Sequence, residues 1–166
     1  MKNTAINTLG YTGTVTLSQY INGKKRIICQ EHNRGNYPLF DFLADCLIGD
    51  FEVASLDRPN KIMLLRENEQ HELEQASTFI YMLNKPEKTV TEGATSSVKY
   101  SFLIPNAMLK NTFSSIGLYN SRTTETDLEH YAAFCNVKDK IKQASSITSA
   151  LVIDWELNIS NKNGDN

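Results

Sequence analysis

The chain has 166 residues, of which 40% are hydrophobic and 22% are charged, and its formal net charge at pH 7 is −2. A chain of this length suits one domain whose core needs neither disulfides nor metal, and the composition excludes disordered and fibrous proteins. The balanced charge argues against nucleic acid as a partner, and no run approaches the ~20 apolar residues of a membrane span, so we expect no membrane partner.

Three cysteines, Cys29, Cys46 and Cys135, are widely spaced and odd in number. Each lies among apolar residues, where a free cysteine behaves as a small buried hydrophobe. We therefore expect no disulfide framework. The start of the chain also lacks the apolar run of a secretion signal, which favours synthesis in a reducing cytoplasm.

A β-hairpin is predicted near the start of the chain. Residues 11–19 are rich in β-branched side chains and alternate with a period of two, and residues 25–30 form the expected return strand. The intervening Asn22-Gly23 favours a type I′ turn, which needs positive φ at both central positions. A turn centred there pairs Leu17 with Ile28.

The spacing predicts a helix over residues 36–49. Asn36 is an expected N-cap, Pro38 suits the first turn, and Gly49 suits the residue after the helix. The apolar residues at helical spacing predict the buried face, and they are Leu39, Phe42, Leu43, Cys46 and Leu47.

The rest of the chain reads as short strands separated by turns and loops. The predicted strands cover residues 61–65, 77–83, 97–104, 113–120, 130–137 and 151–160. The predicted turns and loops cover residues 57–60, 66–75, 84–95 and 138–142. Residues 130–137 also fit one face of a helix, and we favour the strand.

These elements predict a mostly β fold, a jelly-roll-like β-sandwich of seven or eight strands with one short helix. An open barrel fits the same pattern. We expect an N-terminal arm at residues 1–10, one sandwich domain at residues 11–160 and a C-terminal tail at residues 161–166. The last strand, with Trp155 buried, is expected to lie centrally in its sheet.

Metal and cofactor chemistry is not predicted. His32, His71 and His130 lie far apart, and no His or Cys pair has the spacing of a zinc site. The chain has no phosphate-binding loop and no glycine-rich dinucleotide fingerprint. Glutamates surround His71 between residues 67 and 74, but the Asp, Asn and Gly alternation of a calcium loop is absent. We therefore expect no metal-binding and no cofactor-binding residues.

Catalytic groups are equally sparse, and we expect no enzyme. Asp154 and Glu156 share one face of the last predicted strand, about 7 Å apart, a separation compatible with paired-acid hydrolysis. Polar residues opposite an apolar face are also typical of a half-solvated strand, and we favour this interpretation. Cys135 and His130 are five apart, so on a strand their side chains point to opposite faces.

Three stretches of the sequence, taken together, resemble those of a known class of proteins. The first is His32-Asn33-Arg34-Gly35 with the helix that follows and Arg58-Pro59-Asn60-Lys61-Ile62, the second is residues 116–121, and the third is residues 151–160. In this order they resemble small β-rich structural proteins of tailed-bacteriophage virions, of the tail, collar or head-fibre type. The resemblance implies a subunit that works through repeated contacts, and it carries no catalytic residues.

The first functional hypothesis is therefore a structural component of a tailed-phage virion, made in the host bacterial cytoplasm and located in the particle. Its expected partners are other virion proteins and further copies of itself, in a homo-oligomer. Contacts are expected at the Asn22-Gly23 hairpin, residues 84–95 and both termini. The alternative is a non-catalytic carbohydrate- or receptor-binding module, and a third hypothesis is an enzyme that uses Asp154 and Glu156.

Overall fold

The computed structural model describes residues 8–91, 95–110, 112–137 and 150–162. Its strands are β1 (Thr8–Ile21), β2 (Lys24–Gly35), β3 (Pro59–Glu67), β4 (Leu73–Gln75), β5 (Ile80–Tyr81), β6 (Glu87–Thr91), β7 (Thr95–Ile104), β8 (Ser115–Asn120), β9 (Tyr131–Asn136) and β10 (Leu151–Lys162). Its helices are α1 (Tyr37–Ile48), α2 (Phe51–Asp57) and the 3-10 helix η1 (Asn106–Lys110). The prediction of a mostly β chain is confirmed.

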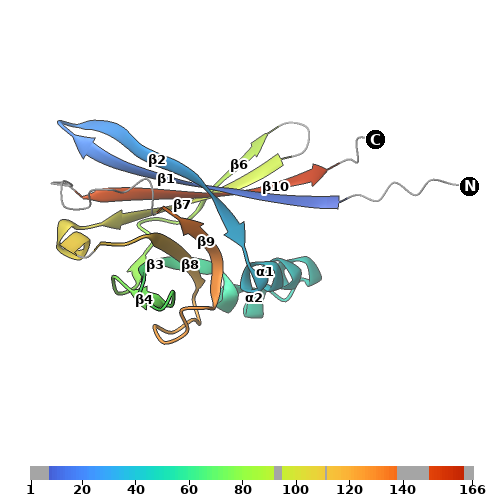
Figure 1. Cartoon of the computed structure of the whole chain (residues 1–166). Coiled ribbons are helices and arrows are strands. Elements are labelled where there is room, and N and C mark those ends of the chain that lie inside the picture. Colours follow the sequence, from blue (N-terminus) through green and yellow to red (C-terminus); the bar gives the residue numbers. More distant parts are fainter. Residues whose placement is uncertain (1–7, 92–94, 111, 138–149, 163–166) are drawn as a thin grey trace, which may run out of the picture.

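The strands form one antiparallel sheet in the order β4-β3-β8-β9-β2-β1-β10-β7-β6, with β5 paired to β3. The long β2 belongs to both halves of this sheet, because it pairs with β1 as far as Asn33 and then with β9 at Arg34 and Gly35. Figure 1 shows the two halves stacked one above the other. The two separate sheets of a jelly-roll-like sandwich are therefore not confirmed.

A second link joins the two halves beyond β5. The Met82 amide donates to the Asn60 carbonyl on β3, and the next amide, that of Leu83, donates to the Ser101 carbonyl on β7. Met82 also forms an isolated bridge with Phe102. The chain thus passes from one half to the other, which is why only Ile80–Tyr81 of the predicted strand at residues 77–83 is a strand.

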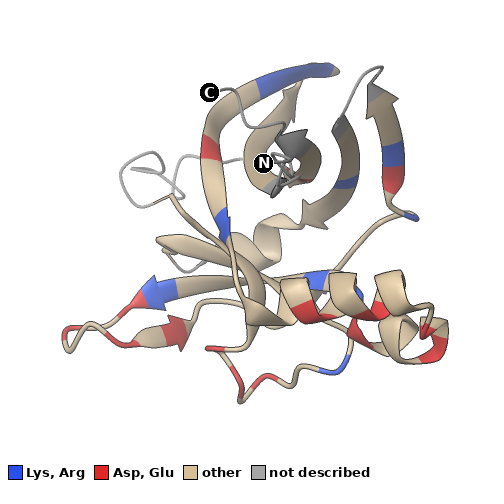
Figure 2. Ribbon diagram, turned by 90° about the vertical axis from the view of Figure 1, so that its right-hand side faces the viewer, with Lys and Arg blue, Asp and Glu red and all other residues tan. Residues whose placement is uncertain are grey.

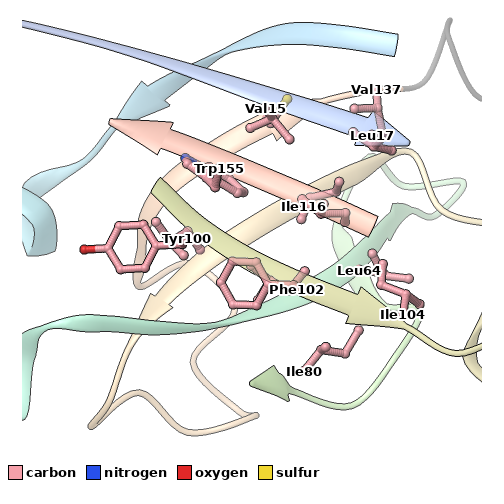
Figure 3. Packing of buried hydrophobic residues seen from close by; sticks show 14 of the residues in the cluster. Val15, Leu17, Leu64, Ile80, Tyr100, Phe102, Ile104, Ile116, Val137 and Trp155 are labelled. Carbon is pink, nitrogen blue, oxygen red and sulfur yellow. The ribbon is translucent and has the colours of Figure 1, made fainter. Parts of the chain in front are cut away.

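One hydrophobic core fills the space between the halves. Leu17, Phe102 and Trp155 enter it from one half and Leu64 and Ile116 from the other, and all five are fully buried (Figure 3). β10 lies between β1 and β7, so the prediction that the last strand is central is confirmed. Alternating apolar side chains on β10 face the core because successive residues of a strand point to opposite sides.

The hairpin is confirmed, but its register differs from the prediction. Asn22 and Gly23 both have positive φ, 52° and 76°. A bulge lies next to Leu17, which pairs with Cys29 instead of Ile28. The extra residue shifts the register by one, and it brings the buried Cys29 opposite the buried Leu17.

The predicted helix is confirmed as α1. It ends at Gly49 in the left-handed conformation, φ 80°, but the Asn36 side chain makes no capping hydrogen bond. The prediction of one helix was wrong, because residues 51–57 form the seven-residue α2, capped by the Asp50 carboxylate, which accepts from the Val53 amide at 3.2 Å. The turn predicted at residues 57–60 is instead the end of α2, the single linking residue Arg58 and the start of β3.

Other boundaries also differ. Residues 84–95 were predicted as a loop, but residues 87–91 form the edge strand β6 against β7, with an ion pair between Glu87 and Lys99. The short β4 lies in the predicted loop at residues 66–75. Residues 8–10 pair with residues 160–162, so the first and last strands extend beyond the predicted limits of 11 and 160. The turn predicted at residues 138–142 lies outside the described residues.

Candidate functional surfaces

The two helices present apolar side chains to solvent at the corner where they meet. α1 buries Leu39 and α2 buries Ala54 against the rest of the fold. Leu47 at the end of α1 is 84% exposed, and Phe51 at the start of α2 is 71% exposed. The other exposed apolar residues of the pair are Tyr37, Phe40, Ile48 and Leu56. We call this face of α1 and α2 the helical surface.

The helical surface is also acidic. Residues 36–57 contain no Lys or Arg and five acidic residues, which are Asp41, Asp45, Asp50, Glu52 and Asp57. Figure 2 shows these residues as red segments along both helices. Burial, followed by the charges of Asp41, Asp57 and Asp50, raises the pKa of the Asp45 carboxyl above its usual value. The carboxylates are therefore close enough to repel one another.

A polar cleft of about 290 Å³ adjoins the start of α1. Its lining residues are Tyr37, Pro38, Asp41, Asp57, Asn120, Arg122, Thr123 and His130. The Arg122 guanidinium lies 2.9 Å from the Asp57 carboxylate, and the Asn120 side-chain amide donates to the Pro38 carbonyl at 3.2 Å. These bonds fix the segment after β8 against both helices.

A buried lysine supports the same segment from β3. The Lys61 side chain is 4% exposed, and its Nζ donates to the carbonyls of Ser121 at 3.0 Å and Thr123 at 2.6 Å. The same ammonium lies 4.2 Å from the centre of the Phe79 ring. Burial lowers the pKa of Lys61, and the charge of Glu125 opposes this shift. Lys61 was not singled out from the sequence, although a lysine inside an apolar strand was the available signal.

The tip of the β1–β2 hairpin carries the opposite charge. The exposed Lys24, Lys25 and Arg26 follow the turn directly. Lys25 is an ion-pair partner of Asp154 at 2.6 Å. Exposed apolar side chains flank the basic residues, and they are Tyr20, Ile21 and Ile27. We call residues 20–27 the hairpin tip.

No protein-family model matches this chain, and neither a curated protein nor a solved structure matches it. Its function can therefore be inferred only from its own surfaces and chemistry.

The acid pair considered from the sequence is engaged in structural contacts. Asp154 accepts hydrogen bonds from Lys25 and from the Ser101 hydroxyl, the latter at 2.7 Å. Burial alone would raise the pKa of Asp154, but the hydrogen bonds from Lys25 and Ser101 hold it below its usual value. Glu156 lies two residues farther along β10, opposite Lys99 on β7. Asp154 is therefore an ionised residue whose contact with Lys25 links the β1–β2 hairpin to β10.

The structure does not bring the other candidate groups together. His130 lines the polar cleft, while Cys135 is fully buried on β9, and burial raises the pKa of its thiol to about 12. His71 contacts Glu67 within the acidic run. Within the described ranges, no three His, Cys, Asp or Glu side chains form a group that could hold a metal ion. The helices of the same ranges are too short or too polar to cross a membrane.

Proposed function

We propose that the protein is an assembly subunit that acts through protein–protein contacts, as a structural component of a tailed-phage virion. The helical surface carries this proposal, because Leu47, Ile48 and Phe51 are mostly exposed within five residues of one corner. Scattered apolar side chains are normal on a monomer, whereas a cluster of large ones bordered by charge is typical of an interface. The virion part of the proposal rests on the resemblance of the three stretches.

The test is the mass of the full chain in solution, measured by light scattering over a range of concentrations. A subunit that assembles with copies of itself gives a mass above 18.7 kDa that rises with concentration. A mass that stays at 18.7 kDa up to millimolar protein contradicts self-assembly. Electron microscopy of the concentrated sample then shows whether the product is a closed ring or an open filament.

The polar cleft supports a second candidate, a carbohydrate- or receptor-binding module. Tyr37 offers a ring that is 71% exposed beside the Asp41 carboxylate, and Arg122 lies in the same cleft. An aromatic face with a few convergent polar groups suits a polyhydroxylated ligand. A glycan array separates the candidates: signal from the wild-type chain that Tyr37→Ala and Asp41→Asn both abolish favours binding, and a blank array contradicts it.

A further inference from the structure

The hairpin tip and the helical surface are complementary in two respects. The hairpin tip carries Lys24 and Arg26 on either side of Lys25, which is paired with Asp154. The helical surface carries five acidic residues and no basic one between residues 36 and 57, and one of the five, Asp57, is paired with Arg122. Each also exposes large apolar side chains, such as Ile27 at 61% and Phe51 at 71%. An apolar centre with a charged rim of opposite sign is the arrangement expected of two surfaces that bind each other.

The two surfaces lie at opposite ends of the molecule. In Figure 1 the turn between β1 and β2 is at the left end, and α1 and α2 are at the lower right. β10 pairs with β1 only as far as Gln19, and β9 pairs with β2 only at Arg34 and Gly35. Of the described strands, only β1 and β2 therefore reach the hairpin tip, which projects away from the helical surface of its own chain.

We infer that the hairpin tip of one copy docks on the helical surface of a second copy. This inference rests on the proposed function and names its partner. Every copy then offers one hairpin tip and one helical surface, so the contact can repeat from copy to copy. A repeating contact between two different surfaces closes into a ring when the rotation allows it and otherwise extends as a filament.

The test reverses the charge of each surface separately. The tip variant is Lys24→Glu with Arg26→Glu, which leaves Lys25 in place for its ion pair with Asp154. The helix variant is Asp41→Lys with Asp45→Lys and Glu52→Lys, which changes the net charge of residues 36–57 from −5 to +1. Asp50 is kept because it caps α2, and Asp57 is kept because it pairs with Arg122.

Each variant alone should need a roughly 10- to 100-fold higher concentration than the wild type to assemble, because like charges then face each other. An equimolar mixture of the two variants should assemble again. The basic tip of the helix variant can bind the acidic helices of the tip variant, and the acidic tip of the tip variant can bind the basic helices of the helix variant. Light scattering gives the mass, and circular dichroism verifies that both variants are folded. The matched control for the helix variant is Glu69→Lys with Glu72→Lys and Glu129→Lys, which makes the same charge change on exposed residues elsewhere and should assemble like the wild type.

Three outcomes overturn the inference in distinguishable ways. If the wild type assembles and both reversed variants assemble equally well, the docking of tip on helices is wrong while the assembly function stands. If the reversed variants are monomeric and their mixture stays monomeric, the two surfaces do not bind each other. A wild type that is monomeric at every concentration overturns both the inference and the self-assembly on which it rests.

Discussion

Replacing Phe51 by serine should weaken self-association without destabilising the folded chain. A phenylalanine side chain buries ~150–250 Å² when it is fully enclosed, and Phe51 is 71% exposed, so about 140 Å² is available to a partner. At about 25 cal/mol per Å² this area corresponds to about 3.5 kcal/mol. Ordering the interface consumes part of that energy, and a loss of about 2 kcal/mol matches a typical interface hot spot.

A loss of about 2 kcal/mol raises the dissociation constant about 30-fold. Sedimentation equilibrium of the wild type and of Phe51→Ser, at matched concentrations and salt, measures this change. The free energy of unfolding should move by less than about 0.5 kcal/mol, since the side chain makes few contacts within its own chain. Leu83→Ser is the control, because Leu83 is 52% exposed and lies outside the helical surface, the hairpin tip and residues 84–95, so its loss should leave the dissociation constant unchanged.

Two results would refute this reasoning. An unchanged dissociation constant for Phe51→Ser would show that the helical surface is not an interface between copies. A fall of more than about 1 kcal/mol in unfolding free energy, a size typical of a core change, would show that Phe51 belongs to the packed interior instead.

Three further predictions concern the fold. Asp154 keeps a depressed pKa through its partner Lys25, so its contribution to stability is present above the usual aspartate pKa of about 3.9 and is lost as the pH falls through the depressed value. In Asp154→Asn the unfolding free energy, measured by denaturant titration, should therefore fall less between about pH 5 and about pH 2 than it does in the wild type. An equal fall in both proteins would contradict the ion pair. Gly23→Ala should cost about 1 kcal/mol in the same assay, because φ is +76° and no neighbouring atom would meet the added Cβ, and an equally stable variant would argue against the type I′ turn. A thiol reagent followed by mass spectrometry should modify the partly exposed Cys46 in the native protein and reach Cys135 only after unfolding, and rapid native modification of Cys135 would contradict its burial.

Local sequence signals predicted the elements that depend on local chemistry. Asn22-Gly23 specifies a turn because positive φ is cheapest for these residue types, and Gly49 ends α1 for the same reason. The alternation of residues 151–160 predicted a strand with one buried face, which β10 is. The bulge that pairs Leu17 with Cys29 was not predictable, because a bulge is selected by packing against the opposite half of the sheet.

The edge strand β6 and the short helix α2 were not predicted from the sequence, for a different reason. Residues 87–91 are polar, as a surface loop is, but a polar composition is also what keeps an edge strand from pairing with other chains. α2 is only seven residues long and buries only Ala54, so it shows too little of a helical period to be recognised. Composition describes the environment of a segment, whereas its hydrogen-bond partners decide whether it becomes a strand.

The helical surface shows that local sequence patterns also fail to predict which apolar residues are exposed. Helical spacing grouped Leu47 with Leu39 and predicted that both face the core, yet Leu39 is 1% exposed and Leu47 is 84% exposed. A period identifies the residues that share a face of a helix, but it does not say how far the underlying sheet extends beneath that face. Phe42 and Leu43 pack against the core, whereas Leu47, one turn after Leu43, is exposed to solvent. One residue of the helical surface, Leu47, is therefore a residue that the helical period assigned to the buried face.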